Sequence, residues 1–535
     1  MDFTNPAACL DLLQKLHPID TARTHATLLQ ITEALQLASP APNQHLEVLE
    51  AAREAIACSQ NERARCYTSQ ALPPDSEENT ILQQVLRLWQ VLSRSYAQIA
   101  RRDAAAGTLD DQRALLAQRR THYAGMALFE YFRAKRAVPA GCWAEIHASH
   151  ASALHAGVDR VRVPDSLNEV WHAQSALEAY VSILLTDIAN PYGRSARELS
   201  WVIRWAQRFA PYCSVNAAEE DAKPAAYGVD LNADVGLRPL GLLPQTPTRL
   251  RFDGSTLASQ IQAVLAQFKH GTKPASLGLG TDCSTDASAR LLLSLYRPWG
   301  RGTAGRRFPR RHSEGRLQLS SDWLTTGFAI EGSVFKQPRS ENQIHRLRED
   351  ISLLTFGERA PEVDTPQHEH QRHQREAERL GLEYELWDML DQSVAGFRLQ
   401  RHAQGERLGH HQLVGIRPPD SDRFLLGDLS WLMYRADGTL EAGVEILPGI
   451  PRVVAVRQAG QKNSRAPYQQ GFMLPASAAL KTPATLLLPS LWYGPGKMID
   501  VHRDEKTHLV RLGRLIRRGM NYDLCAFEAA EPSPT

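Results

Sequence analysis

The sequence has no long hydrophobic run. Nowhere do about 18 uncharged apolar residues follow one another, as a membrane-spanning helix requires. Residues Met1–Pro6 also lack the basic and apolar segments with which a secretion signal begins. We therefore expect a cytoplasmic protein that does not insert into a membrane.

Net charge is small as well. The chain carries 61 lysine and arginine residues against 59 aspartate and glutamate residues, a formal net charge of +2. Proteins that bind DNA or RNA across their surface carry a clear basic excess. The sequence therefore predicts no general binding of DNA or RNA, and any anion site has to be local.

Cysteine is scarce and shows no pairing pattern. There are 7 cysteines, an odd number, and none forms a Cys-x-x-Cys pair. A disulfide framework or a structural zinc site needs regular cysteine spacing, so we interpret these residues as reduced thiols that are mostly buried. A group of histidines lacks the spacing of metal ligands, and we favour a solvated histidine-rich loop over a metal site. These histidines are His368, His370, His373, His410 and His411.

Motifs of known catalytic classes are missing. The chain has no Gly-x-Ser-x-Gly turn and no His-Glu-x-x-His helix. Gly278–Gly280 and Gly300–Gly302 do not lie between a strand and a helix, as a dinucleotide-binding fingerprint would. We expect no enzyme activity, no catalytic residue, no cofactor and no metal. An enzyme of an unrecognised class stays an alternative.

What the sequence does contain is material for several domains, because 535 residues exceed what one hydrophobic core usually serves. Up to about residue 220, apolar residues recur at three- and four-residue steps, which indicates amphipathic helices. Ser195 and Glu198 have the spacing of a capping box at a helix start. The pattern predicts an all-α helical scaffold domain over residues 1–220, where a protein partner is expected to bind. One such helix face comprises Leu82, Val85, Leu86, Trp89, Leu92 and Tyr96.

The next two regions differ in their apolar spacing. Over residues 221–300, a short strand at Arg249–Phe252 and a helix that ends at Gly271 predict a small α/β connector. Beyond residue 310 the period shifts toward two, which is typical of strands. A polar insertion interrupts this pattern at about 335–385.

The strand patterns predict two β domains and hence a multidomain α+β fold. The first is an antiparallel β-barrel over residues 301–457, and the second is a C-terminal β-module over residues 458–535. Strands are expected at 396–399, 412–417, 424–434, 443–447, 484–488, 498–502 and 508–515.

Two polar motifs lie in the region of the first barrel, some eighty positions apart. They are Arg306-Arg307-Phe308-Pro309-Arg310-Arg311 and Asp391-Gln392-Ser393-Val394-Ala395-Gly396. A tryptophan-bearing segment at 427–432 and a Gly-Val-Glu segment at 443–447 follow. Over roughly residues 305–457 the chain resembles the PilZ family, whose members bind cyclic di-GMP through Arg-x-x-x-Arg and (Asp/Asn)-x-Ser-x-x-Gly on a small β-barrel.

This resemblance implies a role for each arginine of the cluster. Arg306 and Arg310 match the motif pair best, which leaves Arg307 and Arg311 as auxiliary charges; the register of Arg307 with Arg311 stays open. Arginine suits such a site because its planar guanidinium is always charged, pairs two acceptors at once and stacks on a purine.

The second motif half supplies different chemistry. The carboxylate of Asp391 can accept the N1 and N2 protons of guanine, and the hydroxyl of Ser393 can bond a base edge or a phosphate. Gly396 would permit a close backbone approach. On the strand that follows, Arg398 ranks as a lower candidate for the same site.

The sequence departs from the family in the distance between the two motif halves, because the insertion at about 335–385 separates them. Loop-closure entropy rises only slowly with loop length, so the barrel can accommodate this insertion. The interpretation is a bacterial cyclic di-GMP effector that couples ligand binding to domain rearrangement, with motility, attachment or exopolysaccharide output. A degenerate PilZ-like adaptor that binds proteins but no nucleotide is the alternative.

Overall fold

The computed structural model describes residues 2–16, 20–219, 226–301, 310–338, 379–402, 405–459, 466–476 and 482–530. The chain forms two compact units. The helical unit comprises Met1–Gln70, Pro74–Arg307 and Met433–Ala436, and the barrel unit comprises Ala71–Pro73, Phe308–Leu432 and Asp437–Thr535. Within the described ranges, no helix is both long and apolar enough to span a bilayer.

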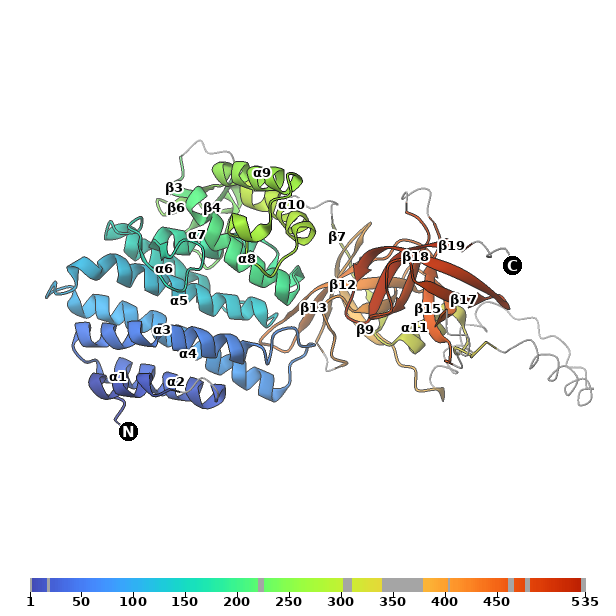
Figure 1. Ribbon diagram of the computed structural model, residues 1–535, viewed down its shortest axis with the longest axis horizontal. Coiled ribbons are helices and arrows are strands. Elements are labelled where there is room, and N and C mark those ends of the chain that lie inside the picture. Colours follow the sequence, from blue (N-terminus) through green and yellow to red (C-terminus); the bar gives the residue numbers. More distant parts are fainter. Residues whose placement is uncertain are drawn as a thin grey trace, which may run out of the picture. The chain divides into compact units, whose positions relative to one another are not determined.

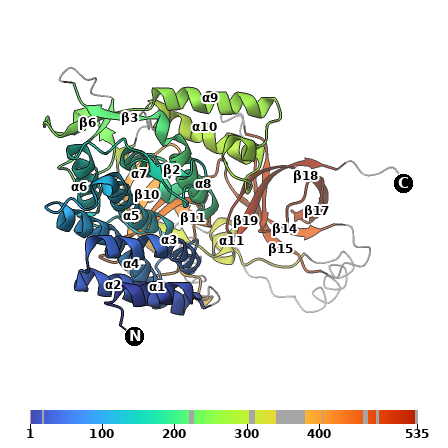
Figure 2. The same cartoon turned by 60° about the vertical axis from the view of Figure 1, so that its left-hand side comes forward.

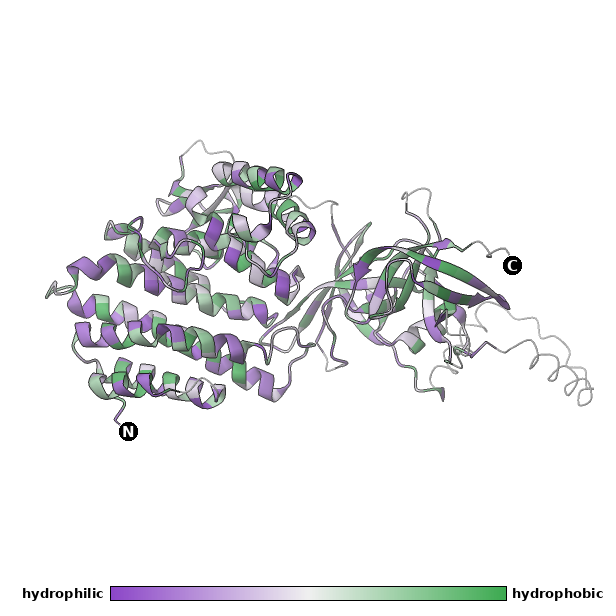
Figure 3. Cartoon of the chain, in the orientation of Figure 1, coloured by the Kyte–Doolittle hydropathy of each residue, from purple (hydrophilic) through white to green (hydrophobic). Residues whose placement is uncertain are grey.

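The first part of the helical unit is a stack of helices with apolar and polar residues on each (Figures 1 and 3). The helices are α1 (Pro6–Gln14), α2 (Thr21–Ala38), α3 (Pro42–Ala64), α4 (Ser76–Asp103), α5 (Arg113–Arg133), α6 (Cys142–His155), α7 (Ala176–Ile188) and α8 (Ala196–Phe209). A two-stranded ribbon, β1 (Val163–Pro164) with β2 (Ala173–Gln174), precedes α7. The capping box expected at Ser195 and Glu198 is present, and all six apolar residues expected on one face of α4 are buried.

A small α/β segment completes the helical unit. Its sheet has the order β3 (Ser214–Ala217), β6 (Arg249–Asp253), β4 (Tyr227–Asp230) and β5 (Arg238–Pro239), followed by α9 (Ser255–Lys269) and α10 (Thr285–Arg301). Trp299 of α10 is fully buried, and its indole nitrogen donates to the carbonyl of Leu185 in α7 at 2.8 Å. The segment expected as a connector therefore shares one hydrophobic core with α5, α7 and α8.

The barrel unit begins with a closed barrel of six strands. Around the ring the order is β8 (Arg316–Ser320), β9 (Glu385–Ser393), β10 (Gly396–Arg401), β13 (Leu440–Ile446), β12 (Leu425–Tyr434) and β11 (Leu413–Arg417), which pairs again with β8. The short strand β7 (Arg311–His312) adds to β9. Helix α11 (Trp323–Glu331) follows β8, and the insertion falls mostly outside the described residues.

A second closed barrel follows (Figure 2). Its ring order is β14 (Arg452–Gln458), β15 (Gln469–Leu474), β16 (Thr485–Pro489), β19 (Tyr522–Ala529), β18 (Lys506–Arg518) and β17 (Met498–Arg503), which pairs again with β14. If the strands of each barrel are counted from one to six along the chain, both rings read one, two, three, six, five, four. The multidomain α+β fold expected from the sequence is thus confirmed, and its C-terminal β-module is a barrel with the same strand order as the first.

A buried polar cluster joins the two barrels. Asp428 of β12 is fully buried and accepts from the guanidinium of Arg517 at 3.0 Å and from the hydroxyl of Tyr522 at 2.7 Å. The ring nitrogen Nδ1 of His411 lies 2.8 Å from the same carboxylate. Burial alone would raise the pKa of Asp428, but these contacts hold it below its ordinary value.

Candidate functional site

The two polar motifs of the first barrel meet on neighbouring strands. Arg311 and His312 of β7 pair with Gln392 and Asp391 of β9, respectively. The second motif half spans the tight hairpin between β9 and β10, in which Ser393 pairs with Gly396. Sheet pairing thus brings together residues that lie about eighty positions apart in the chain.

The side chains of Arg310 and Asp391 form an ion pair. The guanidinium nitrogen Nη1 of Arg310 lies 2.7 Å from Oδ1 of Asp391, and the two side chains are 28% and 16% exposed. A second guanidinium approaches the same carboxylate, since Nη1 of Arg398 lies 3.8 Å from Oδ2. Asp391 and Arg398 are cross-strand partners next to a β-bulge at which β9 carries one extra residue, so their side chains project from the same face.

Arg398 has another partner on the next strand. Its Nε and Nη2 donate to the carboxylate of Glu441 on β13 at 3.2 and 2.8 Å. Only 3% of the Glu441 side chain is exposed. The order of charges is therefore Arg310, which directly precedes β7, then Asp391 of β9, Arg398 of β10 and Glu441 of β13.

Ser393 and Gly396 have local structural roles in this hairpin. The hydroxyl of Ser393 donates to the carbonyl of Gly396 and accepts from the amide of Ala395, both at 3.3 Å. A Cβ on Gly396 would overlap the carbonyl oxygen of Val444 on β13. Glycine is thus required for the close contact between β10 and β13.

The arginine cluster is described only in part. Arg306 and Arg307 lie outside the described residues, as do His368, His370 and His373. Arg311 pairs through its backbone with Gln392, whereas Asp391 is opposite His312. Because neighbouring strand residues project to opposite faces, Arg311 is on the face away from Asp391.

An aromatic side chain covers the sheet beside Arg398. The register partner of Arg398 on β13 is Gly443, and a Cβ on Gly443 would overlap the indole ring of Trp431 from β12. The half-buried indole of Trp431 therefore lies over β13, on the face from which Arg398 projects.

These positions suit an anion that carries flat, hydrogen-bonding rings. Two guanidinium groups flank one carboxylate, so the site offers planar donors for phosphate or purine oxygens and one acceptor for ring N–H groups. Among the described residues no group of histidine, cysteine and carboxylate side chains could hold a metal ion.

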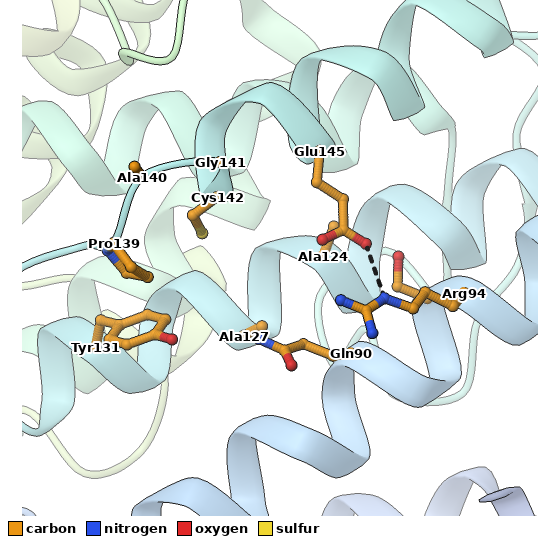
Figure 4. Close-up of a pocket in the computed structure, with 11 residues that line it drawn as sticks. Gln90, Arg94, Ala124, Ala127, Tyr131, Pro139, Ala140, Gly141, Cys142 and Glu145 are labelled. Atoms are coloured by element: carbon orange, nitrogen blue, oxygen red, sulfur yellow. Dashed lines mark ion pairs between the residues drawn. The ribbon is translucent and has the colours of Figure 1, made fainter.

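The helical unit contains a pocket of different character (Figure 4). Its volume is about 240 Å³, and its lining includes Gln90, Arg94, Tyr131, Cys142 and Glu145. Arg94 and Glu145 lie 4.0 Å apart and largely neutralise each other. Burial raises the pKa of the Cys142 thiol to about 12, so this cysteine is protonated and a poor nucleophile at neutral pH. The pocket therefore offers neither a net positive charge nor a reactive nucleophile.

Sequence reasoning missed two residues beside the motif. His312 faces Asp391 across β7 and β9, and Glu441 holds Arg398. His312 directly follows the arginine cluster, which was a usable signal. The sequence contains no signal for Glu441, because its contact with Arg398 depends on the pairing of β10 with β13, which lie far apart in the chain.

Comparisons with known proteins point to one group of receptors. Residues 7–220 match the family model "Cyclic-di-GMP receptor FimW, N-terminal domain", and residues 454–530 match "FimW C-terminal beta-barrel domain". A relative from Pseudomonas aeruginosa, "Cyclic-di-GMP receptor FimW", is 22% identical over 429 residues, which cover 74% of this chain and 69% of the relative. None of these matches names a PilZ domain. Together they show that this chain is similar to cyclic-di-GMP receptors in its helical unit and in its second barrel.

Proposed function

We propose that this protein is a cyclic di-GMP receptor whose ligand binds on the first barrel. The ion pair of Arg310 with Asp391, which joins the two motif halves, carries the proposal. The similarity to a named cyclic-di-GMP receptor supports it independently. The role is binding and signalling, not catalysis.

In this proposal each side chain has a defined task. Arg310, with Arg306 from the same cluster, binds ligand phosphate, and Arg307 adds positive charge. Arg311, on the face away from Asp391, adds charge only at longer range. Asp391 accepts guanine N–H groups, and Ser393 bonds a base edge or a phosphate. Gly396 keeps the hairpin close to β13, and Arg398 adds a planar donor.

The arginine cluster also suggests how binding reaches other parts of the protein. The division between the two units falls within it, between Arg307 and Phe308. A dianionic ligand that binds this segment changes the relative energies of the arrangements of the helical unit, provided that it binds one of them more tightly. We propose that the helical unit holds a protein partner, with motility, attachment or exopolysaccharide control as the output.

Titration calorimetry with cyclic di-GMP tests the proposal. The full chain is expected to bind, and Arg310→Ala to weaken binding by about 100-fold, because a charged hydrogen bond to the ligand is lost. Arg316→Ala is the matched control, since Arg316 pairs with Asp388 on the same sheet at 3.0 Å and its side chain is 68% exposed. An adaptor without a ligand site predicts no binding heat from the wild-type protein.

A further inference from the structure

Glu441 belongs to neither motif half, yet it fixes one edge of Arg398. Nε and Nη2 form one side of the planar guanidinium, and both donate to Oε2 of Glu441. Two donors on a single acceptor hold this edge of the guanidinium toward Glu441. Because the Glu441 carboxylate is 3% exposed, separating it from Arg398 would leave a buried charge without this partner, which is costly.

The opposite edge of the same guanidinium faces the proposed site. Nη1 of Arg398 lies 3.8 Å from Oδ2 of Asp391, longer than a direct hydrogen bond. The Arg398 side chain is 35% exposed, so a ligand can reach it. Arg398 thus lies between the buried carboxylate of Glu441, which holds it, and the partly exposed carboxylate of Asp391, which is proposed to bind the ligand.

We propose that Glu441 is a positioning residue for cyclic di-GMP, which holds Arg398 so that its free edge meets a guanine or phosphate bound beside Asp391. The inference rests on the proposed receptor function and extends it to a residue outside the family motif. A free arginine side chain loses rotamer entropy when it is fixed. Glu441 fixes it before the ligand arrives, so binding is tighter.

A double-mutant cycle in the full chain tests this role. Glu441→Gln keeps the shape of the side chain but removes the charge that holds Arg398, and is expected to weaken cyclic di-GMP binding by about tenfold. Arg398→Ala is expected to weaken binding at least as much. In the double variant, Glu441→Gln should add no further loss, because it acts only through Arg398.

The second barrel offers a matched control. Arg457 on β14 donates from Nε and Nη2 to Oδ2 of Asp500 on β17 at 3.2 and 2.9 Å, nearly the geometry of the pair in the first barrel. Asp500→Asn is therefore expected to leave the affinity unchanged. A loss of affinity as large as that of Glu441→Gln would mean that both variants act through general stability.

The outcomes separate this role from the receptor function. The positioning role is overturned if the wild-type protein binds cyclic di-GMP and Glu441→Gln binds it equally well. It is also overturned if Glu441→Gln still weakens binding in the Arg398→Ala background. Either result leaves the receptor function intact. Absence of wild-type binding overturns both. If Glu441→Gln does not fold, Arg398→Lys replaces it, since lysine keeps the charge but lacks the planar pair of donors. That variant should bind about as weakly as Arg398→Ala, and wild-type affinity would contradict the proposal.

Discussion

The two barrels of this protein have the same cyclic strand order but differ where the second strand meets the third. In the first barrel, β9 ends in Asp391 and Ser393, and a tight hairpin leads to Gly396. In the second, β15 ends in Met473 and Leu474, and ten residues precede β16. The comparison teaches that one barrel topology can be built with or without these polar groups, and that the candidate site belongs to a short segment of it.

Both barrels contain arginines paired with carboxylates, so the presence of arginine does not distinguish the two barrels. In the second barrel, Arg457 and Arg518 are each paired with one carboxylate, Asp500 and Asp523 respectively. In the first barrel, Asp391 lies within 4 Å of two arginines. The first barrel therefore places two planar guanidinium groups beside one partly exposed carboxylate, which a ligand with both acceptors and N–H donors can use.

The largest loss of stability is expected when a glycine of the first barrel is replaced, and a glycine of the second barrel serves as the comparison. Gly396→Ala should destabilise the first barrel by about 3 kcal/mol or more, because the new Cβ overlaps the carbonyl oxygen of Val444 in the neighbouring backbone. At Gly513 of β18 a Cβ would meet Ala526 at an ordinary 3.4 Å, so Gly513→Ala should cost less than about 1 kcal/mol. Urea unfolding measures both. Equal losses would show that the two barrels do not differ in this way.

A similar loss is expected where the barrels meet. Asp428→Asn removes the charge that Arg517 and His411 contact, and should cost about 3 kcal/mol, as when one partner of a buried ion pair is removed. Thermal unfolding measures it. Double replacement by Asp428→Asn and Arg517→Met should recover part of the loss, because the guanidinium that Asp428 neutralised is then removed, while Glu445, its other partner, is 46% exposed to solvent. Failure of this recovery would mean that Tyr522 and His411 dominate the cluster.

Lowering the pH should destabilise the helical unit more than the barrels. Burial lowers the pKa of His45 and of His150 to about 4, below the ordinary value of 6.5. The unfolded state then binds more protons between pH 6.5 and 4, so stability falls as pH falls through this window. The loss is about 2 kcal/mol for each histidine at pH 5.

Hydrogen exchange at pH 7 and pH 5 measures this difference. Helices α3 and α6, which carry the two histidines, should lose protection, whereas β12 with Asp428 should keep it, because the pKa of that carboxyl is already lowered. His45→Gln and His150→Gln should reduce the pH dependence in the helices. A parallel loss in β12 would contradict the comparison.

The smallest effect is expected in a partly exposed ion pair. Asp500→Asn should cost no more than about 1 kcal/mol, since the side chains of Arg457 and Asp500 are 29% and 19% exposed and the pair is screened by solvent. Glu441→Gln should cost more, because its carboxylate is almost fully buried. The unfolding midpoints of Asp500→Asn and Glu441→Gln measure this difference between two ion pairs of matched geometry.

Local patterns made most elements predictable. The capping box at Ser195 and the apolar steps of α4 were readable because both depend on neighbours within one helix. Strand β9 was harder, since its residues Glu385–Ser393 mix charged and apolar side chains, and no strand was expected there. The structure places Asp391 and Ser393 in that strand and only Val394 and Ala395 in the turn.

The candidate site was predictable only where a motif matched. Arg310, Asp391 and Arg398 were named from the sequence, and the structure brings these three together. Glu441 could not be found, because its contact with Arg398 depends on the register of β10 against β13. The identical strand order of the two barrels was also hidden, since it follows from pairings between distant segments.

The position of Trp431 gives the protein a built-in optical probe. Its indole lies over Gly443, the cross-strand partner of Arg398, and is only half-buried. Fluorescence of an indole depends on the charge and solvent around it, so a molecule that settles beside Arg398 should alter its emission. A Trp431→Phe variant would identify that signal among the 10 tryptophans of the chain, and label-free kinetics of occupancy would then be within reach.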